Sequence, residues 1–203
     1  VRLSWSHGDQ EIFSQKELVD LFSLDAVGKS PAVFNPDKLL WLNAHYIKEA
    51  SPARLAEEMK PLWPAEADVS DESFIRKIIV DLQPRAKTLV ELAQASAFYF
   101  AGQIAYEAEA AQKFLTPEVA AHLKSVAAAI PGIEDYSKAG IEAFLKNFIE
   151  ANGIKFKAIA QPLRVALTGK TVSPGIDEVM VTLGKDRVAQ RINAAVDYIA
   201  KQR

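Results

Sequence analysis

The chain has 203 residues, 49% of them hydrophobic, which is enough to bury one large core or two smaller ones. Its 26 acidic and 24 basic side chains give a formal charge of -2, which argues against a protein that coats nucleic acid through bulk positive charge, so any nucleic-acid site must be local. The lack of cysteine excludes disulfides, thiolate metal sites and cysteine nucleophiles, and no run approaches the roughly 18 to 20 apolar residues of a membrane span.

The chain starts inside an apolar segment. Residues 1–6 (VRLSWS) contain no initiator methionine and no charged lead-in of a signal peptide, so we expect a cut end. Ser14 with Glu17 predicts a capping box at the start of a first helix. Further helix starts are predicted where a capping residue precedes a proline, whose missing N–H costs nothing at the first helical position. These pairs are Asn35-Pro36, Ser51-Pro52, Thr116-Pro117 and Ser173-Pro174.

Apolar residues recur at helical spacing in three later segments, 74–82, 141–149 and 188–199. A fourth periodic run, 156–167, contains Pro162, so we expect its helix to kink or restart there. No run alternates apolar and polar residues as a half-buried strand does, and no Asn-Gly or Asp-Gly hairpin turn occurs. The sequence therefore predicts an all-α fold of many short helices.

Turn formers and charges are unevenly distributed. Residues 61–65 (PLWPA) and 129–132 (AIPG) predict joints between groups of helices. Residues 102–151 carry four basic and seven acidic side chains, whereas residues 152–203 carry nine basic and four acidic. One class of function that fits these properties is a helical protein-interaction scaffold, whose basic C-terminal face docks an acidic partner.

The motifs of common active sites are absent. His7, His45 and His122 lie too far apart in sequence to form a local metal-ligand pair. The chain has no Gly-x-Ser-x-Gly elbow, no Walker loop and no Gly-x-Gly-x-x-Gly turn. The adjacent carboxylates Glu57-Glu58 and Asp71-Glu72 would point about 100° apart on a helix, which favours solvated faces over an acid/base pair. We expect no catalytic residue and no metal ligand in this chain.

Three strings match one known family in order. They are residues 2–13 (RLSWSHGDQEIF); residues 29–43 (KSPAVFNPDKLLWLN), followed by Tyr46-Ile47; and residues 160–169 (AQPLRVALTG), followed by 173–176 (SPGI) and 183–185 (LGK). With these strings the chain resembles the bacterial glutamyl-tRNA synthetases, or glutamate–tRNA ligases, along essentially its whole length.

The resemblance implies the C-terminal, tRNA-binding part of a cytoplasmic class I aminoacyl-tRNA synthetase, which activates glutamate with ATP and esterifies it to its tRNA. The family's catalytic domain, with its His-Ile-Gly-His-type motif and ATP loop, lies upstream of Val1. This chain alone would therefore be non-catalytic and hold no cofactor, whereas ATP and Mg²⁺ are expected for the missing domain. Residues 1–48 would end the stem-contact domain, and 49–98 and 99–203 would form two helical anticodon-binding subdomains, an α-helix cage. We expect a monomer that binds tRNA(Glu), and neither DNA nor a membrane.

In the first half of the chain, the resemblance assigns recognition of anticodon bases to two residues. Arg85 matches an arginine that reads the third anticodon base and separates glutamate tRNA from glutamine tRNA, and a guanidinium fork suits the O2 and N3 acceptors of cytosine. Trp41 matches an aromatic residue near an anticodon base, and unpaired bases stack on aromatic rings. Without the family, Arg85 would be an ordinary exposed arginine near a helix end. Trp41 fits a core tryptophan equally well, and that role does not exclude stacking on a base.

The remaining matched residues lie in the basic last quarter. Arg164 matches an arginine that contacts the anticodon loop through a phosphate or base. Ser173, Pro174 and Ile176 match a turn that meets the anticodon bases at a helix N-terminus, where N–H groups are free. Asp177 stands where some relatives have an aromatic residue, so we expect it to cap its helix or accept from a base amino group. Contacts with the loop's phosphates are assigned to Lys170, Lys185, Arg187 and Arg191, each of which would otherwise be a solvated surface charge.

Overall fold

The structure of the protein is a computed structural model that describes residues 4–29 and 33–202, so the strings at 2–13 and 29–43 lie partly outside the described residues. Within those ranges it contains ten α-helices, two short 3-10 turns and one isolated bridge between His7 and Gln10, without a β-strand. The all-α prediction is confirmed. The helices are α1 (Gln15–Leu21), α2 (Pro36–Glu49), α3 (Pro52–Glu58), α4 (Glu72–Leu82), α5 (Leu89–Phe100), α6 (Ala108–Phe114), α7 (Pro117–Ala129), α8 (Lys138–Asn152), α9 (Phe156–Thr168) and α10 (Ile176–Lys201).

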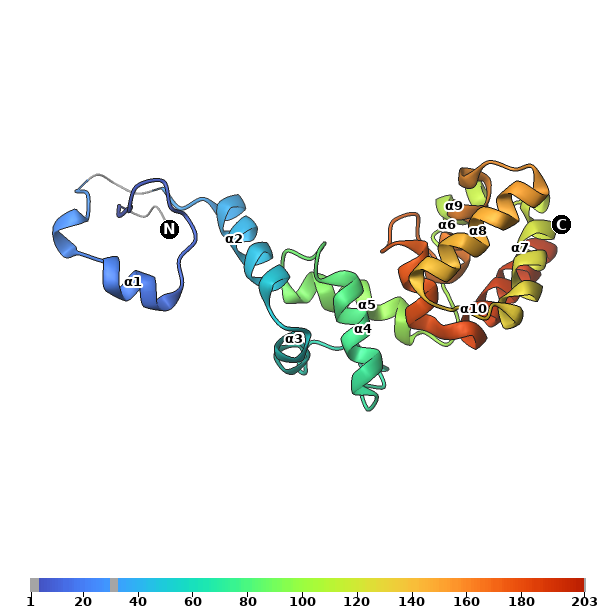
Figure 1. The fold of residues 1–203 in the computed structure, drawn as a ribbon, viewed down its shortest axis with the longest axis horizontal. Helices are drawn as coiled ribbons and strands as arrows, with labels where there is room; N and C mark the ends of the chain where they lie inside the picture. The colour runs from blue at the N-terminus through green and yellow to red at the C-terminus, as the bar shows by residue number, and fades with distance from the viewer. Residues whose placement is uncertain (1–3, 30–32, 203) are drawn as a thin grey trace.

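The helices form an elongated arrangement with the N-terminus at one end (Figure 1). The segment with α1 lies at that end, and α2 leads from it to a middle group of helices, α3 to α5. A C-terminal group, α6 to α10, lies at the other end. Helix α10 packs against α7, α8 and α9 and also contacts α4, so it joins the two groups. One continuous buried cluster extends from Ile47 in α2 to Ile199 in α10.

The apolar faces predicted from the sequence are the faces that pack inward. In α4 the buried residues are Ile75, Ile78, Ile79 and Leu82, together with one carboxylate, Asp81. Helix α8 buries Ile141 and Leu145, and the second half of α10 buries Val188, Ile192, Ala195 and Ile199. Burial of apolar area is the main favourable term in folding, so these faces hold the helices together.

Three of the predicted helix starts form as expected. Ser14 and Glu17 make a capping box in which the Ser14 N–H donates to the Glu17 carboxylate at 2.7 Å. The side chains of Asn35 and Ser51 each accept from a backbone N–H of the first turn, ahead of a proline. Helix α7 starts at the predicted proline, but Thr116 before it makes no side-chain cap bond.

The prediction that Ser173-Pro174 starts a helix is wrong, because α10 begins at Ile176 with Gly175 as its N-cap residue. The Ser173 hydroxyl accepts a hydrogen bond from the Arg164 guanidinium instead of capping the helix. The Gly175 N–H donates to the carboxylate of Glu178 at 2.8 Å, so a side chain of the helix's own first turn satisfies this donor.

The kink or restart predicted at Pro162 does not break the helix, since α9 stays helical from Phe156 to Thr168. Pro162 is buried, and its missing N–H removes only one bond from a helix whose apolar face is packed on both sides of it. The discontinuity lies instead at Gly184 of α10, where φ is 78° and ψ is 163°. Glycine adopts a positive φ without the steric cost of a Cβ atom, so it is the residue that joins the two helical pieces of α10.

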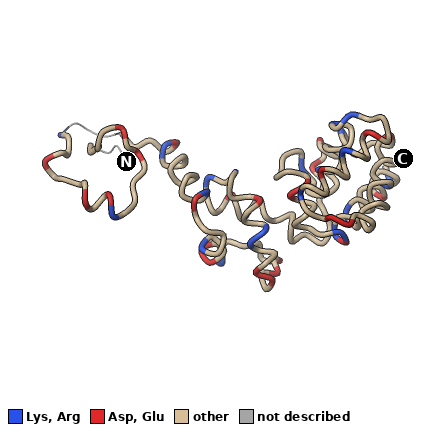
Figure 2. Tube along the Cα trace, in the orientation of Figure 1, with Lys and Arg blue, Asp and Glu red and all other residues tan. Residues whose placement is uncertain are grey.

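Basic and acidic residues are interspersed along the chain (Figure 2). The adjacent carboxylates noted in the sequence belong to helix surfaces: Glu58 pairs with Arg54 at 2.8 Å, Glu57 with Lys60 at 2.5 Å and Glu72 with Arg76 at 3.1 Å, while Asp71 caps α4. Across residues 4–29 and 33–202, none of the helices combines the length and apolarity of a membrane span.

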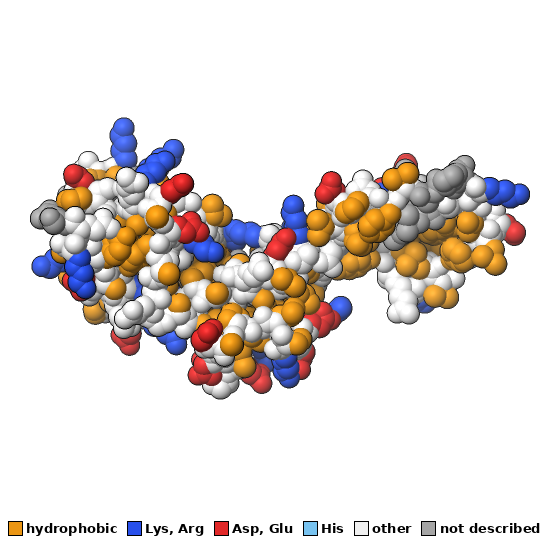
Figure 3. Space-filling model, turned by 180° about the vertical axis from the view of Figure 1, so that it is seen from behind, with side chains coloured by type: hydrophobic (Ala, Val, Ile, Leu, Met, Phe, Trp, Pro, Cys, Tyr) orange, Lys and Arg blue, Asp and Glu red, His pale blue; other side chains and the backbone are white. Residues whose placement is uncertain are grey.

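The N-terminal segment has a small aromatic centre and an apolar surface. Trp5 packs against Phe13 and Phe22, with ring centroids 5.6 and 5.8 Å apart. The Tyr46 hydroxyl of α2 donates to the Phe13 carbonyl at 2.8 Å and ties this segment to α2. Val19 and Leu24 are 73% and 80% exposed, and Figure 3 shows apolar side chains spread over this end of the molecule.

Candidate nucleic-acid interface

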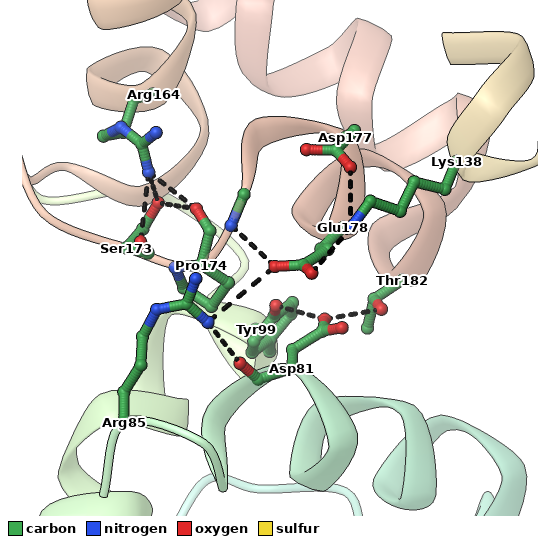
Figure 4. A network of polar contacts seen from close by, with 11 residues as sticks. Asp81, Arg85, Tyr99, Lys138, Arg164, Ser173, Pro174, Asp177, Glu178 and Thr182 are labelled. Carbon is green, nitrogen blue, oxygen red and sulfur yellow. Dashed lines mark hydrogen bonds and ion pairs between the residues drawn. The ribbon is translucent and has the colours of Figure 1, made fainter. Parts of the chain in front are cut away.

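The candidate interface lies where the middle and C-terminal groups meet. Figure 4 shows Arg85 extending from the connection between α4 and α5 toward the Ser173-Pro174 turn, which belongs to the connection between α9 and α10. Segments that are far apart in sequence thus place two arginines, Arg85 and Arg164, on either side of one turn. We call this site the junction. It comprises Arg85, Arg164, the Ser173-Pro174 turn and the residues that form hydrogen bonds or ion pairs with them.

Arg164 holds the turn in place. Its Nη1 donates to the Pro174 carbonyl at 2.6 Å, to the Ser173 carbonyl at 3.2 Å and to the Ser173 hydroxyl. The hydroxyl in turn donates to the Pro174 carbonyl at 2.8 Å. A turn held by charge-assisted hydrogen bonds keeps its shape when a ligand arrives, so the position of the turn is prepared before binding.

Arg85 is held at one end only. Its Nη1 donates to the Asp81 carbonyl at 3.1 Å and lies 3.8 Å from the Glu178 carboxylate. Its side chain is 51% exposed, and neither Nε nor Nη2 has a hydrogen-bond partner among the described residues. A guanidinium carries five N–H donors in a plane, so Arg85 presents a partly unused donor edge to solvent.

The positively charged guanidinium groups of Arg85 and Arg164 repel each other. Burial lowers the pKa of Arg164, the positive charge of Arg85 lowers it further, and Asp177 opposes both effects. Arginine stays protonated in proteins despite such shifts. An anionic ligand, or one rich in acceptor atoms, would relieve this local repulsion, although the whole chain has a formal charge of -2.

Acidic residues at the start of α10 balance part of this charge. Lys138 at the start of α8 donates to Glu178 at 3.0 Å and lies 3.4 Å from Asp177. Burial raises the pKa of Glu178, but hydrogen bonds from Lys138 and the Gly175 N–H outweigh it, so the net shift is downward and the group is ionised. Asp177 thus pairs with a lysine, and the predicted capping role is taken by Glu178.

A buried carboxylate lies beneath Arg85. One oxygen of Asp81 accepts from the Tyr99 hydroxyl at 2.6 Å and from the Thr182 hydroxyl at 2.7 Å. These three residues belong to α4, α5 and α10, and Thr182 lies 101 residues from Asp81 in sequence. Burial raises the pKa of Asp81, and the two hydroxyl donors partly oppose that rise. The carboxylate therefore ties three helices together under the exposed arginine.

The other predicted residues differ in how available they are. Lys170 is exposed beside the turn, whereas Pro174 and Ile176 are buried. Lys185 donates to the carbonyls of Pro131, at 3.3 Å, and Ile133. Arg187 lies over the Phe74 ring, 4.8 Å from its centroid, and lines a cavity between α4 and α10. Lys185 and Arg187 thus already have partners within the fold.

Arg191 is part of the interior. It is 4% exposed, and its guanidinium donates to the carbonyls of Leu167, Phe98 and Ala101, each at 2.8 Å. Burial lowers its pKa to about 10, which leaves it charged at neutral pH. Because its donors point to backbone acceptors inside the C-terminal group, the assignment of Arg191 to an RNA phosphate conflicts with its burial.

Trp41 lies apart from the junction. It is 48% exposed on α2, so it is not a core tryptophan. Its neighbour Asn43 donates to the Lys87 carbonyl at 2.6 Å, in the connection that also carries Arg85. Side chains two positions apart on a helix point about 160° away from each other. Trp41 therefore faces away from that connection, and the structure does not bring it together with Arg85 and Arg164.

Comparison with known proteins places this arrangement in a family. A family model described as "Anticodon binding domain" matches residues 54–196, which include both arginines and the turn. The chain belongs to this anticodon-binding family. It is 58% identical over 200 residues to "Glutamate--tRNA ligase 1" of Syntrophus aciditrophicus (strain SB), covering 98% of this chain and 42% of that protein. It is 49% identical to "Glutamate--tRNA ligase" of Geobacter sulfurreducens, covering 98% and 43%.

The fold is shared with solved structures. A crystal structure of a glutamate tRNA ligase from Elizabethkingia meningosepticum in complex with its amino acid superposes with a TM-score of 0.88 at 28% identity, covering 98% of this chain and 39% of that one. The chain spans about two fifths of the length of the curated relatives it matches. Trp41 precedes the residues matched by the anticodon-binding family model, whereas Arg85 and Arg164 lie within them.

Five side chains that hold the junction together were not predicted from the sequence: Asp81, Tyr99, Lys138, Glu178 and Thr182. One signal was present for Asp81, because a carboxylate interrupts the apolar face of 74–82 at helical spacing from Ile78. A buried charge needs partners, so this position could have been flagged from the sequence. The identity of the partners, on α5 and α10, could not, because no local pattern encodes contacts between distant helices.

Proposed function

We propose that this chain is the anticodon-recognition part of a glutamate–tRNA ligase and binds tRNA(Glu), while a catalytic domain elsewhere in the longer protein attaches glutamate with ATP and Mg²⁺. The observation that carries the proposal is the partly unused donor edge of Arg85 beside a turn held by Arg164, inside residues matched by an anticodon-binding family. The names of the relatives, all glutamate–tRNA ligases, supply the amino acid and the tRNA.

The proposed base reader is Arg85. Its free Nε–H and Nη2–H donors fit the O2 and N3 acceptors of an unpaired cytosine, which is the third anticodon base of glutamate tRNA. Guanine, the third base of the glutamine anticodon, presents donors at the corresponding edge and leaves a desolvated guanidinium unpaired. Such a mismatch is expensive, so a single arginine can discriminate between the two tRNAs.

The turn and its surroundings complete the proposed interface. Arg164 and Ser173 would shape the surface that the anticodon loop meets, with the buried side chains of Pro174 and Ile176 supporting the turn from beneath, and the exposed Lys170 would contact a phosphate. Lys185 and Arg187 would add positive potential from their positions on α10. Trp41 would stack on a base or loop nucleotide away from the junction. We leave Arg191 out because it is buried.

The proposed organisation follows the same assignment. Residues 1–48 would close the stem-contact domain, and residues 49–98 and 99–203 would be the two anticodon-binding subdomains, with the junction between them. We propose a monomer that works in the cytoplasm, where tRNA is charged.

The experiment compares two RNA hairpins that differ only in the third anticodon base, cytosine for glutamate and guanine for glutamine. Fluorescence anisotropy at two salt concentrations should show tighter binding of the cytosine hairpin, about tenfold or more at both salts for one good base contact. Equal binding of the two hairpins would overturn the proposal. The alternative function, a helical scaffold that docks an acidic protein partner, predicts equal binding of the two hairpins. The same titration therefore decides between the two functions.

A further inference from the structure

Glu178 lies at the centre of the junction and has three partners. One carboxylate oxygen accepts from the Gly175 N–H at 2.8 Å and lies 3.8 Å from Nη1 of Arg85, and the other accepts from Lys138 at 3.0 Å. Its side chain is 27% exposed. The capping and lysine contacts fix the carboxylate independently of Arg85, so Glu178 is a rigid point to which the arginine can be attached (Figure 4).

Arg85 is attached from two sides through the same nitrogen. Nη1 contacts the Asp81 carbonyl from α4 and the Glu178 carboxylate from α10. The hydroxyls of Tyr99 and Thr182 hold the Asp81 side chain, which keeps α4 and α10 at a fixed separation here. This leaves the opposite edge of the guanidinium, Nε and Nη2, turned toward the open side.

The charges around the turn are close to balanced only because Glu178 is present. Arg85, Arg164 and Lys138 contribute three positive charges, and Asp177 and Glu178 contribute two negative ones. Neutralising Glu178 would leave Asp177 as the one carboxylate of this set. An arginine whose positive charge is not balanced by a nearby carboxylate attracts any RNA phosphate within reach. Phosphate contacts carry no sequence information.

We infer that Glu178 is a positioning residue that determines specificity: it holds Arg85 by one edge and cancels part of its charge, so that Arg85 reads a base edge and does not bind phosphates of any RNA. The inference rests on the proposed function, since it concerns how Arg85 tells two anticodons apart.

The test is Glu178→Gln, which keeps an amide oxygen for the Gly175 N–H, removes the charge and replaces the oxygen that accepts from Lys138 with an NH2 group. The matched control is Asp197→Asn, which makes the same charge change on the exposed side of the same helix, far from the turn. Both variants of the 203-residue chain are titrated with the cytosine and guanine hairpins across a salt series, and their melting temperatures are recorded.

We expect Glu178→Gln to bind the guanine hairpin about three- to tenfold more tightly, with a salt dependence steeper by up to about one phosphate contact. Binding of the cytosine hairpin should change less than about twofold, so the ratio between the hairpins falls. The control should leave that ratio unchanged. A purely structural role predicts that the affinities for both hairpins fall by the same factor, and that result would overturn the inference. An unchanged ratio between the two affinities, or the same change in the control, would also overturn it.

Failure of the proposed function, and failure of the variant to fold, can each be told apart from failure of the inference about Glu178. If wild-type protein does not distinguish the hairpins, the proposed function itself fails, and the specificity role of Glu178 fails with it. If Glu178→Gln does not fold, Lys138→Met tests the same relation, because the Gly175 N–H still holds the Glu178 carboxylate, whose charge then acts on Arg85 without the competing lysine. The ratio between the hairpins should then rise, and an unchanged or lower ratio would contradict the inference.

Discussion

Arg191 and Arg85 show two uses of the same side chain in two regions of the molecule. In the C-terminal group, Arg191 is 4% exposed and donates to three backbone carbonyls, so its donors are consumed by the fold. At the junction, Arg85 is 51% exposed and uses one nitrogen only. The fraction of hydrogen-bond donors already satisfied within the fold, more than the residue type or the local charge, therefore separates a structural arginine from a candidate ligand-binding one.

The largest effect is expected when the structural arginine is removed. Arg191→Met would leave the carbonyls of Leu167, Phe98 and Ala101 without this donor inside the protein, and each unsatisfied buried group costs roughly 1 to 3 kcal/mol. We expect a loss of about 3 kcal/mol or more in the free energy of unfolding, measured by urea titration. The folded fraction should keep its preference between the hairpins. A stable variant with a changed preference would reverse the roles assigned to the two arginines.

A smaller loss is expected at the carboxylate under the junction. Asp81→Ala would deprive the hydroxyls of Tyr99 and Thr182 of their shared acceptor, at a cost of about 2 kcal/mol. Asp81→Asn keeps an acceptor oxygen and should recover part of this loss. A double-mutant cycle with Thr182→Val measures the bond between α4 and α10 directly. If Asp81→Ala and Thr182→Val are additive, that bond does not contribute to stability.

The exposed arginine should affect recognition and leave stability alone. Arg85→Gln should lower the preference for the cytosine hairpin about tenfold, which corresponds to about 1.4 kcal/mol. The midpoint of urea unfolding should shift little, because surface substitutions usually change stability by less than about 0.5 kcal/mol. Equal loss of affinity for both hairpins would show that Arg85 contacts the backbone and reads no base.

The smallest effect concerns pH. The pKa of Glu178 in the folded protein lies below its usual 4.5, so the unfolded chain binds the proton more readily in acid. The stabilisation from this group is therefore present above pH 4.5 and is lost as the pH falls through the folded pKa. The difference in unfolding free energy between wild type and Glu178→Gln, at most about 1 kcal/mol at pH 7, should shrink as the pH falls below 4.5. Asp81 titrates in both proteins; its pKa is raised mainly by burial, and only the smaller rise caused by the charge of Glu178 remains in this difference. A difference that grows in acid would show that Glu178 is not held as an anion.

Much of this protein is determined by the sequence alone. The apolar faces of α4, α8 and α10 and the caps at Ser14, Asn35 and Ser51 follow from helical spacing and from the need to satisfy free backbone N–H groups. Both are local rules that act within a few residues, and they suffice for an all-α chain. The motif strings were long enough to indicate the similarity to glutamate–tRNA ligases, and the comparisons place the chain in the anticodon-binding family.

Only the tertiary structure decided which charged side chains are free. Lys185 and Arg191 could not be told from surface charges in the sequence, because their acceptors lie 52 and up to 93 residues away. The Ser173-Pro174 pair has the pattern of a helix start, yet Arg164 from the preceding helix uses its acceptors, and α10 begins later. Hydrogen-bond donors and acceptors are satisfied by whichever groups the packing brings within about 3 Å, and packing is a property of the whole chain.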